Sequence, residues 1–125
     1  LELRGRVLVV DDEPRIRDTI RDILAGHEIV ENANGDQAIA LLQDDAAFDV
    51  VVCDVMMTQG SGLDVHAWLA EHYPGLARRL VFISGGTFTP RSRAYIRRVG
   101  NPLLDKPFAP RELRKIVAEL MSDES

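Results

Sequence analysis

Short apolar runs alternate with amphipathic stretches along this chain. Contiguous apolar runs predict buried strands at 6–10, 49–53 and 80–83, and shorter apolar pairs predict further strands at 27–31 and 103–104. Apolar residues at helical spacing predict helices between them, which begin at Pro14, Pro90 and Pro110 and cover 38–42 and 63–70. The third helix is expected to end before Pro74, with a loop leading into the next strand.

Strands that alternate with helices favour a parallel sheet covered on both faces. Five strand–helix repeats with right-handed crossovers predict an α/β protein, a flavodoxin-like (βα)5 fold. Its doubly wound, five-stranded parallel sheet is expected to have the strand order 2-1-3-4-5. One domain over residues 1–125 is expected, with frayed ends at 1–5 and 122–125.

Polar residues follow four of the predicted strands. Asp11 and Asp12 follow the first, Asp54 the third, Ser84 the fourth and Lys106 the fifth. The carboxyl ends of parallel strands open on one edge of the sheet, where open α/β sheets place their ligands. The sequence therefore predicts that these five residues converge.

Three carboxylates at one edge repel one another unless something offsets their charge. Two unit charges about 5 Å apart, at an effective dielectric constant near 20, repel by roughly 3 kcal/mol. A hard divalent ion would offset this charge, and Mg²⁺ prefers to be held by a few carboxylates together with waters. A metal, a carboxylate nucleophile and an opposing lysine together indicate phosphoryl transfer. In such a site an aspartate can serve as the nucleophile, and the Ser84 hydroxyl can hydrogen-bond a phosphoryl oxygen.

Each of these residues also has an ordinary structural explanation. Asp54 ends a strand, Asp11 and Asp12 suit the start of a helix, Ser84 suits a turn and Lys106 suits a solvated surface. These explanations account poorly for the convergence of four strand ends. On the predicted third helix, histidine and tryptophan are expected to pack or to lie exposed rather than to catalyse, namely His66, Trp68 and His72.

Composition excludes few classes of protein. The net charge of -5 argues weakly against nucleic acid as a direct partner, and no apolar run approaches the length of a membrane span. Cys53 is the only cysteine, so neither an intramolecular disulfide nor a cysteine-based metal cluster is expected, and a reducing cytoplasm is the default location. The chain starts with Leu1, which is compatible with a segment of a longer protein.

Five motifs in order, together with Gly62 eight residues after Asp54, resemble the receiver domain of two-component response regulators. The resemblance extends over essentially the whole chain. Its motifs are V-L-V-V-D-D-E-P (7–14), N-G-D-Q-A (34–38), V-V-V-C-D-V-M-M (50–57), F-I-S-G-G (82–86) and D-K-P-F (105–108).

The resemblance implies a role for each residue of the predicted site. Asp54 is implied to accept a phosphoryl group from a phosphohistidine of a histidine kinase or histidine phosphotransfer domain. The implied Mg²⁺ ligands are Asp12 directly, Asp11 through water, Asp54, and the Met56 carbonyl. Ser84 is the implied switch hydroxyl, and Lys106, before a peptide bond that is commonly cis in the family, contacts the phosphoryl group.

Some positions depart from the family pattern. Thr58 replaces the usual proline four residues after the acceptor, and Met56 is an apolar residue beside it. Leu103 stands where the family usually has a switch aromatic, which puts a rotating-ring switch in doubt. The stretches 85–90 and 101–108 are similar to receivers attached to hybrid histidine kinases.

Three alternatives remain at this stage. A haloacid-dehalogenase-like phosphohydrolase needs a D-x-D motif after the first strand, whereas Asp11 and Asp12 are adjacent. A pseudo-receiver that acts without phosphorylation usually lacks the acceptor or an acidic residue. A flavodoxin-like FMN carrier has a first loop rich in glycine and hydroxyls rather than an acidic one.

Overall fold

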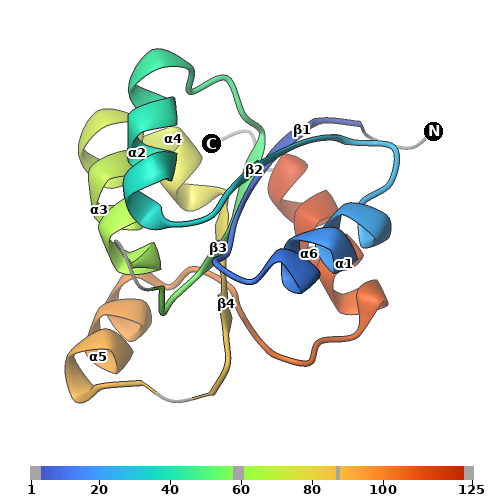
Figure 1. Cartoon of the computed structure of the whole chain (residues 1–125). Coiled ribbons are helices and arrows are strands. Elements are labelled where there is room, and N and C mark those ends of the chain that lie inside the picture. Colours follow the sequence, from blue (N-terminus) through green and yellow to red (C-terminus); the bar gives the residue numbers. More distant parts are fainter. Residues whose placement is uncertain (1–3, 58–60, 87, 123–125) are drawn as a thin grey trace.

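The computed structural model describes residues 4–57, 61–86 and 88–122 (Figure 1). These residues form five strands and six helices. The strands are β1 (Arg6–Val10), β2 (Glu28–Asn32), β3 (Val50–Asp54), β4 (Leu80–Ser84) and β5 (Leu103–Asp105). The helices are α1 (Pro14–Ile23), α2 (Gly35–Asp44), α3 (Gly62–His72), α4 (Pro74–Arg78), α5 (Pro90–Val99) and α6 (Pro110–Met121).

All neighbouring strands pair in parallel, in the order β2-β1-β3-β4-β5. Helices α1 and α6 cover one face of the sheet, and α2, α3, α4 and α5 lie on the other (Figure 1). The predicted doubly wound α/β fold and its strand order are therefore confirmed.

Successive residues of the central strands face the two helical layers in turn. Val50 and Val52 pack with the layer of α1 and α6, whereas Val51 and Cys53 pack with the opposite layer. Every residue of β3 is buried, as an unbroken apolar run predicts for a strand covered on both faces. Burial of each such valine stabilises the fold by about 1.5–3 kcal/mol relative to exposure, which fixes the position of the strand's carboxyl end.

The main difference from the predicted elements is α4, a short helix where a loop was expected. Pro74 occupies its first turn, where a missing N–H is tolerated, and Leu76 and Ala77 are buried under α3 and the sheet. Tertiary burial thus favours a helix where the Pro-Gly pair alone indicated a turn.

The expected frayed ends lie partly outside the described residues, at 1–3 and 123–125. The backbone N–H of Gly5 donates to His27 Nδ1 at 3.0 Å, and that of Ser122 donates to the Ala118 carbonyl at 3.1 Å.

Among the helices within the described ranges, none has both the length and the apolar character needed to cross a bilayer.

Gly62, at the start of α3, lies directly against the chain that leaves β3. A Cβ atom on Gly62 would lie 2.3 Å from the Asp54 carbonyl oxygen. The Gly62 N–H donates to the Val55 carbonyl at 3.1 Å, which fixes this close approach. Only glycine lets α3 begin this near to the strand end that carries Asp54.

Gly62→Ala is therefore expected to lower the free energy of unfolding by about 1–3 kcal/mol, because backbone must move to admit the methyl group. Urea unfolding of the purified variants measures this change. Gly75→Ala is the matched control, since a Cβ there would make an ordinary 3.7 Å contact with Arg79 Nη1. Equal losses in the two variants would contradict the proposed steric role of Gly62.

Candidate functional site

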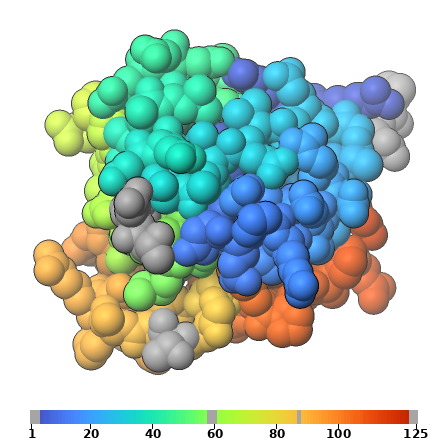
Figure 2. Space-filling model, in the orientation of Figure 1, coloured from blue at the N-terminus to red at the C-terminus, as the bar shows by residue number. Residues whose placement is uncertain are grey.

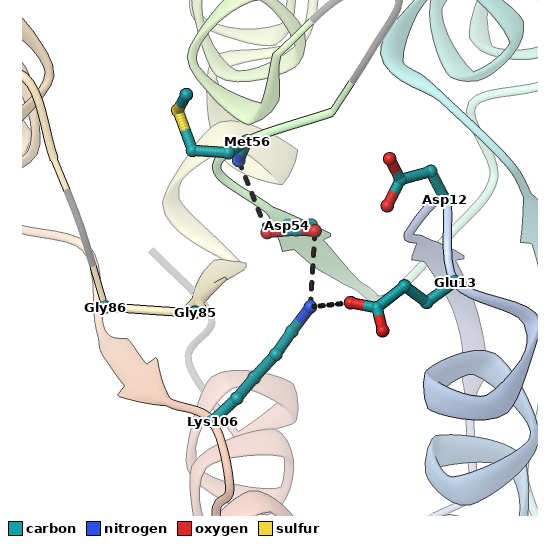
Figure 3. A pocket seen from close by; sticks show the side chains of 7 residues that line it. All are labelled: Asp12, Glu13, Asp54, Met56, Gly85, Gly86 and Lys106. Atoms are coloured by element: carbon teal, nitrogen blue, oxygen red, sulfur yellow. Dashed lines mark hydrogen bonds and ion pairs between the residues drawn. The ribbon is translucent and has the colours of Figure 1, made fainter.

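The predicted site residues meet at the carboxyl edge of the sheet. Asp11 follows β1, Asp54 ends β3, Ser84 ends β4 and Lys106 follows β5. Asp12, Asp54 and Lys106 line an open cavity of about 490 Å³, which Figure 3 shows from close by.

Three carboxylates form the acidic part of the site. Asp11, Asp12 and Asp54 each offer an oxygen, and these oxygens all lie within 4.8 Å of one another. Asp11 is fully buried and Asp54 is 4% exposed, whereas Asp12 is partly exposed. Clustered carboxylate oxygens beside open space suit a hard divalent cation.

One lysine is shared among the surrounding acids. Lys106 Nζ lies 3.0 Å from Asp11 Oδ2, 3.3 Å from Asp54 Oδ2 and 3.3 Å from Glu13 Oε1. Figure 3 shows the contacts with Asp54 and Glu13. Sequence reasoning did not place Glu13 in the site, because an acidic residue just before Pro14 has a sufficient explanation at the start of a helix. Its position directly after Asp11 and Asp12 was the only available signal.

Backbone N–H groups fix the second oxygen of each buried carboxylate. Asp11 Oδ1 accepts from the Glu13 N–H at 2.8 Å, and Asp54 Oδ1 accepts from the Met56 N–H at 3.3 Å. Each is a local turn in which an aspartate binds the backbone two residues further on. The other oxygen, Oδ2, is thereby left for Lys106 in both residues.

Burial dominates the electrostatics of the site. It raises the pKa of Asp54 to about 6, with the charge of Asp11 adding to the shift and Lys106 and the Met56 N–H opposing it. Burial likewise raises the pKa of Asp11. Burial alone would lower the pKa of Lys106, but its acidic neighbours outweigh this and raise it to about 12. A single, firmly protonated ammonium therefore faces more acids than it can neutralise.

Ser84 reaches the same edge, but its hydroxyl is engaged by its own loop. The side chain is 1% exposed, and its Oγ accepts from the Gly86 N–H at 3.0 Å. Gly85 and Gly86 line the cavity on the side opposite Asp12 (Figure 3).

The positions that depart from the family pattern have distinct settings. Met56 is 51% exposed at the cavity, and its backbone N–H donates to Asp54 Oδ1. Leu103 is half-buried and packs against the core on the α3 side of the sheet. Thr58 lies outside the described residues. The Lys106-Pro107 peptide bond is cis, as the resemblance implied.

The fold and the site together define a class: a doubly wound α/β protein with an acidic, lysine-bearing cavity at the carboxyl edge of its sheet. The sequence model of the response regulator receiver domain family matches residues 7–118. The chain belongs to this family and is a signalling domain, a receiver of two-component response regulators.

Curated relatives agree with this assignment. The chain is 31% identical over 120 residues to the alginate biosynthesis transcriptional regulatory protein AlgB of Pseudomonas aeruginosa, covering 94% of this chain and 26% of AlgB. It is 28% identical over 120 residues to the uncharacterized transcriptional regulatory protein YrkP of Bacillus subtilis, covering 92% of this chain and 49% of YrkP. The chain thus spans about half, or less, of these relatives.

Solved structures share the fold. NtrX from Brucella abortus superposes with a TM-score of 0.81 at 29% identity, over 95% of this chain and 27% of NtrX. A CheY-like receiver domain protein from Methanospirillum hungatei gives a TM-score of 0.84 over 95% of this chain and 94% of its own, at 21% identity, and so supports the fold alone.

The raised pKa of Asp54 predicts how stability depends on pH in metal-free buffer. The folded state holds the Asp54 proton up to about pH 6, whereas the unfolded state releases it near the ordinary value of 3.8. The stabilisation from this proton is therefore complete below about pH 4 and is lost as the pH rises through about 6. By pH 7.5 the charged, buried carboxylate opposes folding by on the order of 3 kcal/mol.

Asp54→Asn is expected to remove this dependence and to be more stable than the wild type at pH 7.5, while the two converge below pH 4. Urea unfolding between pH 4 and 7.5 with EDTA measures both curves. Asp18→Asn, at an exposed position on α1, is the matched control and should follow the wild type. Parallel curves for wild type and Asp54→Asn would show that burial does not perturb Asp54.

Proposed function

We propose that this receiver domain accepts a phosphoryl group on Asp54 from the phosphohistidine of a histidine kinase or a histidine phosphotransfer domain. The observation that carries the proposal is the setting of Asp54, whose buried carboxylate at the end of β3 borders the cavity beside an ammonium and two further carboxylates. In the transfer, an Asp54 oxygen forms a new O–P bond while the N–P bond breaks, and the imidazole keeps the electron pair of that bond.

Lys106 has two successive partners in this proposal. In the free domain its ammonium is 3.3 Å from Asp54 Oδ2 and holds that oxygen at the cavity. When the carboxylate becomes an acyl phosphate, its negative charge moves outward onto the phosphoryl oxygens, and the ammonium follows it. Asp11 keeps Lys106 at the site during this change, through the closest of its three ion pairs.

The acidic cluster fits the Mg²⁺ that the sequence predicted. Asp11, Asp12 and Asp54 supply hard oxygen ligands at one edge of the cavity, and the Met56 carbonyl completes the proposed set. When bound, the ion supplies positive charge that neutralises the carboxylates and the incoming phosphoryl oxygens. The excess of acids over ammonium groups in the described site supports this assignment.

Ser84 and the partners complete the proposal. Ser84 exchanges its bond with Gly86 for one to a phosphoryl oxygen, which makes the segment after β4 report on phosphorylation. The domain is proposed to catalyse only its own phosphorylation and dephosphorylation, within a longer signalling protein and without contacting nucleic acid itself. Its cytoplasmic location stays a prediction.

Phosphorylation on Asp54 is expected to add the mass of one phosphoryl group when the domain is incubated with a small acyl phosphate and Mg²⁺. Asp54→Asn should abolish the shift, because an amide oxygen is not a competent nucleophile here. Intact-mass spectrometry measures the change, and Asp18→Asn should label like the wild type. Undiminished labelling of Asp54→Asn would place the acceptor elsewhere.

The metal requirement is tested separately. EDTA should block labelling, and Asp12→Ala should weaken Mg²⁺ binding by more than about tenfold, since even the loss of an outer-shell partner of a metal ligand reduces affinity by 10–100-fold. Calorimetric titration with MgCl₂ measures the affinity, and Asp18→Ala, which removes an exposed carboxylate elsewhere, is the control. Equal labelling with and without EDTA would refute the proposed role of the ion.

A further inference from the structure

Helix α5 is thinly attached to the rest of the domain. Ser92 and Ile96 are its buried residues, and the helix forms an outer corner of the molecule (orange in Figures 1 and 2). Along its seam with α3 lie two cavities, of about 350 Å³ beside Tyr95 and about 260 Å³ beside His66. Few apolar contacts therefore oppose a displacement of this helix.

A partly buried polar contact bridges the seam between these cavities. The Tyr95 hydroxyl on α5 lies 2.8 Å from His66 Nδ1 on α3, and the two rings meet edge to face at 5.6 Å. The His66 side is rigid, because His66 is only 6% exposed, follows the fully buried Val65 and lies 5.7 Å from the ring of Phe82 on β4.

Asn101 lies beside this contact and is held by the backbone. Its side-chain nitrogen donates to the carbonyls of Ala77 and Leu80, both at 2.8 Å, which uses both of its hydrogens. Burial lowers the pKa of His66, and the Asn101 side chain opposes this shift.

The same helix is connected to Ser84 through the segment that follows β4. In the structure Ser84 Oγ is bonded to Gly86, and the segment leads to Thr89, whose side chain caps α5 by accepting from the Ser92 N–H at 3.0 Å. A helix moves as a stiff body, so a shift of its first turn displaces Tyr95 as well. A hydrogen bond of 2.8 Å is lost after a displacement of about 1 Å.

We propose that His66 and Tyr95 are positioning residues: their hydrogen bond holds α5 in the arrangement in which Ser84 stays bonded to Gly86, and it opens when Ser84 turns to a phosphoryl group on Asp54. The proposal rests on the proposed function, which it deepens by naming what restrains the switch. A bond made only in the unphosphorylated arrangement stabilises that arrangement alone, so its removal favours the phosphorylated one.

Tyr95→Phe tests the proposal because it removes only the hydroxyl. Beryllofluoride, which imitates a phosphoryl group on aspartate, should bind this variant roughly two- to tenfold more tightly than the wild type in the presence of Mg²⁺, the range that one net hydrogen bond supplies. In the free protein, amide hydrogen exchange over residues 90–99 should be faster. A purely structural role would lower stability without shifting the affinity.

Two further variants isolate the bond. Tyr95→Phe should have no additional effect in a His66→Phe background, because the partner of the Tyr95 hydroxyl is already absent. Tyr73→Phe, at a tyrosine that is 43% exposed beside α3, is the matched control and should bind beryllofluoride like the wild type.

Unchanged or weaker beryllofluoride binding by a folded Tyr95→Phe variant would overturn the proposal, and additive effects of the two substitutions would do so as well. Failure of the wild type to bind beryllofluoride at Asp54 would instead sink the proposed function. Amide hydrogen exchange in the free protein then still tests whether the His66–Tyr95 hydrogen bond restrains α5. Faster exchange of residues 90–99 in Tyr95→Phe supports this restraint, and unchanged exchange rejects it.

Discussion

The crowding of carboxylates around one ammonium is the constraint on which this structure depends. Lys106 faces Asp11, Asp54 and Glu13 at 3.0–3.3 Å, and Asp12 adds a further negative charge at the same cavity. Such an arrangement is electrostatically unfavourable, and it persists only because the chain cannot relax away from it. Burial, with the charge of Asp11 adding to it, raises the pKa of Asp54 to about 6. A cation or a phosphoryl group with its counter-ion relieves the crowding of charge, so the same crowding that opposes folding favours binding.

The hydrophobic core supplies the rigidity that keeps the charges together. β1, β3 and β4 are covered on both faces, so their carboxyl ends cannot slide or separate without exposing valine, leucine and isoleucine side chains. Gly62 then brings α3 directly against the end of β3, which closes one side of the site with backbone. Rigid strand ends and a close helix start thus confine Asp54, whereas Met56 beside it stays exposed.

Rigidity is not uniform, and the contrast has a physical basis. The sheet and the helices α1, α3 and α6 bury wide apolar faces, whereas α5 buries little and depends on a polar contact across its seam with α3. A hydrogen bond is short-ranged and directional, so it breaks over a small displacement, whereas an apolar interface resists gradually. The segment that carries Ser84 therefore connects the most rigid part of the molecule to its least constrained helix.

The sequence by itself determined the strand order and the identity of the residues at the carboxyl edge. Apolar periodicity is a local property, and the end of each buried run places Asp11, Asp54, Ser84 and Lys106 before any contact is known. Only the tertiary structure decided the rest. Glu13 joined the site and α4 replaced a loop, because each outcome depends on neighbours brought together by folding. The bond between His66 and Tyr95 is the clearest case, since it joins residues 29 positions apart whose types alone indicate only packing or exposure.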